Sequence, residues 1–381
     1  MYIINCICCV LIILIIHCTV GVGYGLCRIA LGHYWGYLIG IMESLEYILL
    51  AAVCAYELGL EITESFECSK YLEPLWWLLF YIPALYVTVM KRRIFWSLNI
   101  VLAVVSLGIL LCFCFGSIPY FNHQHLKSDN DTTIPYFEGG IEWFFYALPV
   151  ASWMFVGIEC VVLITGHLKE PAVSLTNGLL SCTTILLCTS FAVIILACGQ
   201  EDVDELHEEN NPLNIGFKNM FGMNYHKASL LDIPSTIALG LAVMYSSGSQ
   251  MKAMADSTLL PEIFKYTYGD APAGSLVIGS VVGYVFCVLM FFVPNFFEIT
   301  FMICFTCAFF MYIGILLSYC IYVVRYKRSS SKFNSPFGLY GAVYGVLIFS
   351  LSIVSSLVFV PLDEYRLGKK VIYMLLVTCC L

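Results

Sequence analysis

Two glutamates, Glu43 and Glu46, interrupt the otherwise apolar run GIMESLEYILL. Because they are three residues apart, a helix would place both side chains on one face, toward the interior of a helix bundle. Their apolar neighbours would then face elsewhere: Leu45, Ile48 and Leu49. Carboxyl groups are costly inside hydrocarbon and usually mark a pathway or a paired contact. One interpretation is that a carboxylate here meets a cationic ammonium group. The other is a structural role, in which Glu46 hydrogen-bonds neighbouring helices.

A second polar cluster lies in the apolar stretch ALPVASWMFVGIE, between Pro149 and Gly157. Proline and glycine interrupt the hydrogen bonds of a helix, and at bilayer depth the freed groups are tolerated only against protein or a water-filled cavity. We expect the helix to break here and to present its backbone to a small molecule; an ordinary proline kink is the alternative. The residues expected at this site are Ser152, Trp153, Met154, Phe155 and Gly157.

Two side chains of this segment have more specific expected roles. Trp153 or Phe155 could offer a ring face to an ammonium group, whereas aromatic packing within a helix is the alternative. Glu159 lies two residues after Gly157. A carboxyl group at that position fits a gate, a coupling role or packing better than direct contact with a ligand.

The sequence carries no pattern typical of an enzyme or of a metal centre. Its seven histidines are scattered, and the closest pair, His123 and His125, has no cluster of acids or cysteines beside it. No glycine-rich phosphate loop followed by lysine is present, which argues against ATP-driven chemistry. The 19 cysteines lie almost entirely in apolar segments, where cysteine behaves as a small hydrophobe, so no disulfide framework is expected. We predict no catalytic residue, no metal and no cofactor.

Composition places the chain in a lipid bilayer. Of its 381 residues, 60% are hydrophobic and 12% are charged, and the mean hydropathy is +0.88. Apolar stretches of about 20 residues, long enough to cross a bilayer as helices, recur along the whole length. We predict an all-α polytopic membrane protein with about ten complete spans and a partial one. The complete spans are expected at 2–22, 36–57, 74–90, 94–117, 141–165, 175–198, 229–250, 272–294, 298–324 and 337–360.

The basic residues indicate which loops face the cytoplasm. Most of them fall on one side of the predicted topology: Arg28, residues 91–93, Lys169, Lys252, Lys265, Arg325, Lys327, Arg328 and Lys332. The opposite loops carry acidic runs at 57–67 and 201–210, and the sequon at Asn130 lies on that outer side, where it could be glycosylated. The longest loops, 118–140 and 199–228, are polar and are expected to cap the surface. The net charge of −8 argues against a nucleic-acid partner.

Several longer sequence blocks carry a family resemblance. They are GVGYGLCRIALGHYWGYLIGIMESLEYIL (21–49), ALPVASWMFVGIE (147–159), HLKEPAVSLTNG (167–178), SGSQMKAMADSTLLPEIF (247–264) and NSPFGLYGAVYG (334–345). In that order they resemble the third helix, the broken sixth helix, the loops after the sixth and eighth helices, and the entry to the eleventh helix of the amino acid-polyamine-organocation superfamily. The closest likeness is to its ethanolamine-permease-like branch.

This resemblance implies a LeuT-type helical bundle with inverted repeats, in which the broken sixth helix and the third and eighth helices hold a substrate near the midplane. It implies secondary-active transport of an amino acid or a small amine such as ethanolamine by alternating access. The expected partners are that small molecule, a coupling proton or ion, and the lipid bilayer. The expected location is the plasma membrane.

The chain also departs from the family pattern. We expect a single transporter domain over residues 1–370 that lacks the family's first broken helix, followed by a truncated last span at 371–381. The span at 94–117, fifth in the family's order, contains no lysine or other cation. A transport-incompetent truncated relative, or a membrane sensor or scaffold, is therefore the alternative function.

Overall fold

The computed structural model describes residues 22–122, 145, 148–149, 156–167, 171–200, 212–326 and 338–358. Within these ranges the regular structure is helical, and the only β feature is an isolated bridge between Tyr268 and Ala271. Seven of the described helices are long and apolar enough to cross a membrane. An eighth span arises if Tyr225–Leu231 and Ile233–Asp256, which meet at an angle of 42°, are taken together. The prediction of an all-α polytopic membrane protein is confirmed.

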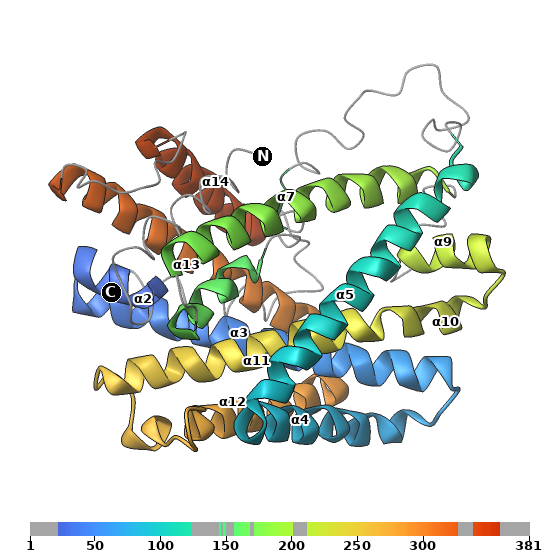
Figure 1. The fold of residues 1–381 in the computed structure, drawn as a ribbon, viewed down its shortest axis with the longest axis horizontal. Helices are drawn as coiled ribbons and strands as arrows, with labels where there is room; N and C mark the ends of the chain where they lie inside the picture. Colours follow the sequence, from blue (N-terminus) through green and yellow to red (C-terminus); the bar gives the residue numbers. More distant parts are fainter. Residues whose placement is uncertain are drawn as a thin grey trace.

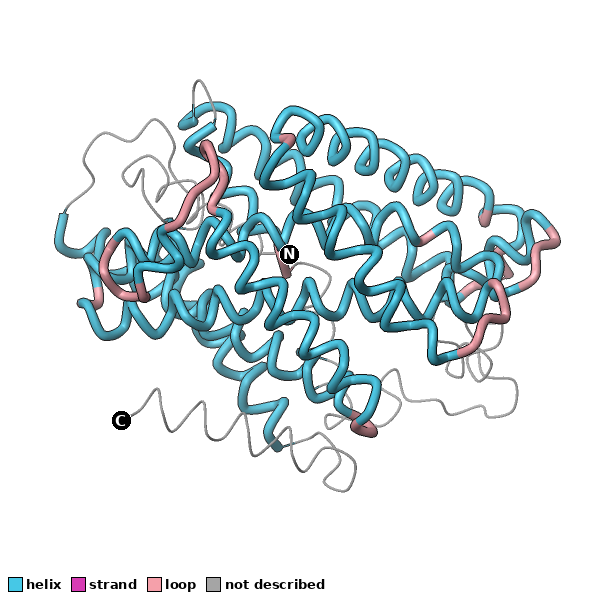
Figure 2. Tube along the Cα trace, turned by 90° about the horizontal axis from the view of Figure 1, so that it is seen from below, coloured by secondary structure: helices cyan, strands magenta, loops and turns pink. Residues whose placement is uncertain are grey.

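Figures 1 and 2 show the main helices. They are α2 (Val22–Ala30), α3 (His33–Ser65), α4 (Glu73–Met90), α5 (Arg92–Gly116), α7 (Pro171–Cys198), α9 (Pro212–Phe221), α10 (Tyr225–Ala228), α11 (Ile233–Asp256), α12 (Ala273–Phe292), α13 (Phe296–Tyr326) and α14 (Gly338–Val358). The 3₁₀ segments are η1 (Lys70–Leu72), η2 (Ile118–Tyr120), η3 (Ile158–His167), η4 (Ser229–Leu231) and η5 (Glu262–Lys265). Helices therefore lie at eight of the predicted spans; those at 2–22 and 371–381 and most of 141–165 fall outside the described residues.

Helix α3 is the central element of the bundle. It packs against α2, α4, α11, α12 and α13, and in Figure 1 it runs beside α11 through the middle of the molecule. Its middle carries the small residues Ala51, Ala52 and Ala55, all buried. Small side chains let neighbouring helices approach closely, which is the usual basis of helix packing in membranes.

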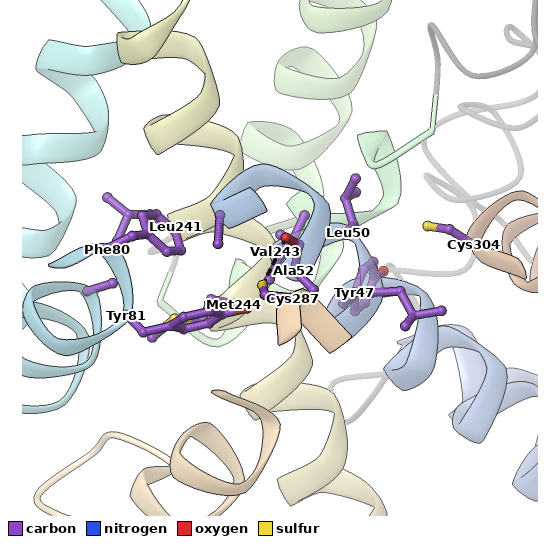
Figure 3. Close-up of a cluster of buried hydrophobic side chains, with 14 of the residues drawn as sticks. Tyr47, Leu50, Ala52, Phe80, Tyr81, Leu241, Val243, Met244, Cys287 and Cys304 are labelled. Carbon is purple, nitrogen blue, oxygen red and sulfur yellow. Dashed lines mark hydrogen bonds between the residues drawn. The ribbon is translucent and has the colours of Figure 1, made fainter. Parts of the chain in front are cut away.

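The largest described core surrounds the middle of α3. Figure 3 labels ten of its side chains, contributed by α3, α4, α11, α12 and α13: Tyr47, Leu50, Ala52, Phe80, Tyr81, Leu241, Val243, Met244, Cys287 and Cys304. All ten are buried. This packing fixes the position of α3 relative to its neighbours and hence the position of its two central glutamates.

The outer helices have the opposite character. Helices α5 and α7 expose large apolar side chains, among them Val101, Val104, Phe191 and Ile195. Many exposed apolar side chains of this kind are unfavourable in water and favourable against lipid. These two helices therefore present the lipid-facing side of the bundle.

The acidic run at 57–67 was expected to be a loop, and that expectation is wrong. Helix α3 continues through it to Ser65, because Leu58 and Thr63 are buried against neighbouring elements and hold the last turns in place. The helix ends where Glu67 adopts a positive φ of 52° and the Cys68 amide donates to the Thr63 carbonyl at 2.9 Å.

The expected loop at 199–228 also contains more structure than its polarity suggested. Helices α9 and α10 lie within it. The buried Phe217 of α9 packs against Phe113 of α5, with ring centroids 5.7 Å apart. Leu213 and Met220 of α9 pack against the same cluster. This apolar face covers only a ten-residue helix, too short to stand out as a hydrophobic period in a polar segment.

Candidate binding site in the membrane helices

Three glutamates lie in the interior of the bundle. Glu43 is 3% exposed, Glu46 is 0% exposed and Glu159 is 2% exposed. The first two come from α3 and the third from η3. The prediction that Glu43 and Glu46 point inward is confirmed, but Ile48 and Leu49 are buried as well, because α3 is surrounded by other helices.

Glu43 is held by two hydrogen bonds. The Tyr47 hydroxyl donates to its Oε1 at 3.2 Å, and Nε2 of Gln250 in α11 donates to its Oε2 at 2.5 Å. Gly23 of α2 lies against the same carboxyl group, since a Cβ at that position would approach Oε2 to 2.8 Å. Glu43 therefore links α2, α3 and α11, which matches the structural role that a buried carboxyl group can have.

Glu159 is held at a break in the backbone. Gly157 has a φ of +95°, which favours glycine, and the 3₁₀ segment η3 begins at the next residue. The Gly157 amide donates to both carboxyl oxygens of Glu159 at 3.1 Å, and the Tyr312 hydroxyl of α13 donates to Oε2 at 2.6 Å. The backbone is thus non-helical at Gly157, and Glu159 fastens this turn to α13.

Glu46 differs from both. Neither of its carboxyl oxygens accepts a hydrogen bond from a donor in the described part of the chain, although the Glu159 carboxyl group lies close enough to share a proton with it. Its carboxyl group lies close enough to those of Glu43 and Glu159 to interact with both electrostatically. None of the ion pairs formed between described residues involves these three glutamates. A fully buried carboxyl group without a partner is costly, so this position favours a bound proton or a bound cation.

The remaining predicted site residues lie outside the described residues: Ser152, Trp153, Met154 and Phe155, together with the sequon residue Asn130. Helical backbone is described at Pro149 and non-helical backbone at Gly157. The break predicted between these two residues lies mostly outside the described residues and stays a prediction.

Sequence reasoning missed three residues of the site. Gln250 was noted only as part of a family block, and neither Tyr312 nor Gly23 was singled out. A glutamine in a mid-helix run such as SSGSQM carries a weak signal, because a polar amide at bilayer depth needs a partner. Tyr312 gives no such signal, since aromatic residues are common throughout α13.

A pocket of about 680 Å³ lies between α3, α11 and α13, toward the end of α3. Four of its residues are acidic: Glu57, Glu61, Asp232 and Glu298. Two more are the aromatic residues Tyr56 and Phe297, whose ring centroids are 5.6 Å apart. Cys54 also lines it and lies two helical turns, about 12 Å, from Glu46 along α3. In the described residues, no group of three or more His, Cys, Asp or Glu side chains is placed to hold a metal ion.

Together, these apolar helices and their buried acidic cluster define a polytopic α-helical membrane protein. The sequence model of the amino acid permease family matches residues 1–381, and the chain belongs to that family. A comparison with curated protein sequences returned no significant match. Family membership assigns the chain to the transporters of small molecules rather than to the enzymes, within the amino acid-polyamine-organocation superfamily.

Proposed function

We propose that this permease is a secondary-active transporter of a small molecule with an ammonium group, either an ethanolamine-like amine or an amino acid, and that it works by alternating access. The observation that carries the proposal is Glu46, a fully buried carboxyl group without a partner in the described residues, close to the backbone break at Gly157. An ammonium group would supply both the positive charge and the hydrogen-bond donors that this carboxyl group lacks.

The other residues of the site are assigned the following roles. Glu43 contributes negative charge beside Glu46 while Tyr47 and Gln250 hold it in place. The backbone around Gly157 and the side chains of Ser152, Trp153, Met154 and Phe155 close over the substrate, with a ring face toward the ammonium group. Glu159 acts as a gate or coupling group through its bond to Tyr312.

The acidic pocket supports a cationic substrate. Four carboxyl groups around one pocket create a negative potential that raises the local concentration of cations. The two aromatic rings beside them offer faces on which an ammonium group can rest. We assign this pocket as the entrance to the site.

Uptake into proteoliposomes tests the proposal. Reconstituted protein should accumulate labelled ethanolamine or an amino acid, and Trp153→Ala should abolish that uptake with expression unchanged. Trp35→Ala is the matched control, because Trp35 lies on α3 but is 43% exposed. Absence of uptake for every small amine and amino acid tried, by protein that is correctly folded, would contradict the proposal and favour a sensor or scaffold.

We also propose that the protein resides in the plasma membrane and carries a glycan on Asn130. The support is the sequon and the basic loops on the opposite side. Asn130→Gln should increase electrophoretic mobility after expression in a eukaryotic host, and imaging of a fluorescent fusion should place the protein at the cell periphery.

A further inference from the structure

We propose that Glu46 holds a proton when the substrate site is empty and releases it when an ammonium group binds, so that the protein exchanges an amine cation for a proton. This inference rests on the proposed function. It concerns the protonation state of Glu46 when no substrate is bound. Transport alone requires only that the substrate binds on one side and leaves on the other.

The contrast between the three glutamates singles out Glu46. Glu43 accepts hydrogen bonds from Tyr47 and Gln250, and Glu159 accepts them from Tyr312 and Gly157. Either carboxylate can therefore hold negative charge with donors already in place. Glu46 is equally buried but has no donor among the described residues. An ionised Glu46 in an empty site would be an uncompensated charge in the bundle interior.

The ionisable groups around Glu46 do not offer an alternative counter-charge. They come from α3, η3 and α13, and they are Glu43, Tyr47, Glu159, Cys160, Cys304 and Tyr312. Each of these is neutral or negative in its ordinary ionisation states. A proton on Glu46, shared with the nearby Glu159 carboxyl group, therefore compensates the charge of Glu46 when no substrate is bound. When the substrate is bound, its ammonium group takes that role.

The exchange balances in atoms and in charge. When the ammonium group arrives, Glu46 loses one proton to water on that side, and the carboxylate and the ammonium form an ion pair. When the substrate leaves on the other side, Glu46 takes up one proton there. For a substrate with a single positive charge, one charge moves each way and the cycle is electroneutral.

Proton release can be measured without transport. Titration calorimetry of ethanolamine into the purified protein, in two buffers of different ionisation enthalpy, should report about one proton released per amine bound near neutral pH. Glu46→Gln, which matches a protonated glutamate in shape, should remove this release. Glu64→Gln is the matched control, because Glu64 is another α3 glutamate but its side chain is 50% exposed, and it should keep the release.

Transport gives a second readout. An interior more acidic by one pH unit should raise the initial rate of ethanolamine uptake by wild-type vesicles well above the baseline, toward a limit of about tenfold accumulation, independent of membrane potential. Protein-free vesicles and Glu46→Gln vesicles supply the baseline, since neutral ethanolamine can cross lipid and become trapped by acid. If Glu46→Gln fails to fold, the wild-type calorimetry still decides the number of protons.

The outcomes separate the two claims. Wild-type uptake without proton release and without a response to the pH gradient would overturn the exchange and leave the transporter standing. Proton release that survives in Glu46→Gln would overturn the assignment to Glu46. Absence of both amine binding and uptake would overturn the proposed function and this inference with it.

Discussion

Glu43 and Glu46 show how one helix face can hold two carboxyl groups with different roles. Both are buried on α3, three residues apart, yet only Glu43 has hydrogen-bond donors in the described structure. Glu43 therefore acts as a structural link between helices, whereas Glu46 lacks a donor that a ligand could supply. The sequence left these two interpretations open, and the structure favours a different one for each residue.

The bond from Tyr312 to Glu159 should contribute to stability. Tyr312→Phe removes a buried hydroxyl donor at 2.6 Å and leaves Glu159 with the Gly157 amide. The free energy of unfolding should fall by about 1 to 3 kcal/mol, which thermal unfolding in detergent would detect. Tyr340→Phe is the control, because Tyr340 is 90% exposed and should show no change. Equal behaviour of the two variants would contradict the assigned bond.

The contact of Gly23 with Glu43 predicts an effect on binding. In Gly23→Ala the new methyl group would lie 2.8 Å from Oε2 and push the carboxyl group away from Gln250. Loss of one hydrogen bond of about 1.4 kcal/mol should weaken amine binding about tenfold, as measured by calorimetry. Gly108→Ala, at a site with nothing within 4 Å, should leave binding unchanged. Wild-type affinity in Gly23→Ala would show that the position of Glu43 does not matter to the substrate.

Part of the site could be predicted from residue patterns in the sequence. The spacing of Glu43 and Glu46, and the placing of Glu159 after a glycine, were visible in the sequence. Gln250 and Tyr312 were not, because they are distant in sequence from the glutamates they contact and only the packing of α3 with α11 and α13 brings them together.

At the scale of elements, the break before η3 is the feature on which the site depends. The positive φ of +95° at Gly157 turns the chain so that Glu159 can face both the Gly157 amide and Tyr312. The proline and glycine that frame the segment predicted a helix break, and the described backbone at Gly157 is non-helical. The 3₁₀ geometry of the following residues was not predictable, since their apolar composition fits an α-helix equally well.

Gly157→Ala should test this element. A Cβ in left-handed backbone costs about 1 to 2 kcal/mol, although the space around Gly157 is open, so the penalty is conformational rather than steric. We expect lower thermal stability and reduced amine uptake. Gly178→Ala, in the helical part of α7 with nothing within 4 Å, should retain both. Unchanged uptake by Gly157→Ala would mean that the break is not required.

Helix positions were the easiest elements to predict, because apolar length alone identifies a span. The ends were harder. Helix α3 extends through acidic residues to Ser65, where tertiary packing of Leu58 and Thr63 outweighs polar composition. That extension matters for function, since it carries Glu57 and Glu61 into the acidic pocket.

At the scale of the whole molecule, the acidic pocket and the buried cluster lie along the same helix. A cation drawn to Glu57 and Glu61 would need to travel about two helical turns past Cys54 to reach Glu46. The acidic pocket and the buried glutamates of α3 therefore suit a cationic substrate and disfavour an anionic one. No sequence pattern alone could have assembled the pocket, because α11 and α13 form its other walls.

The pocket predicts a dependence on ionic strength. Glu57→Gln combined with Glu61→Gln should raise the KM for ethanolamine several-fold at low salt with little change in maximal rate, because capture of the cation weakens while the inner site stays intact. Uptake measured at low and high salt checks this, and the difference from wild type should shrink as salt increases. A salt-independent effect would contradict an electrostatic role for the pocket.

The central claim is that the unpartnered carboxyl group of Glu46 recognises an ammonium group. The most direct measurement is calorimetric binding of ethanolamine and of ethylene glycol, which carries a hydroxyl in place of the ammonium, to wild type and to Glu46→Gln. We predict that wild type binds ethanolamine and not ethylene glycol, and that Glu46→Gln loses this preference. Equal ethanolamine affinity in wild type and Glu46→Gln would contradict the account.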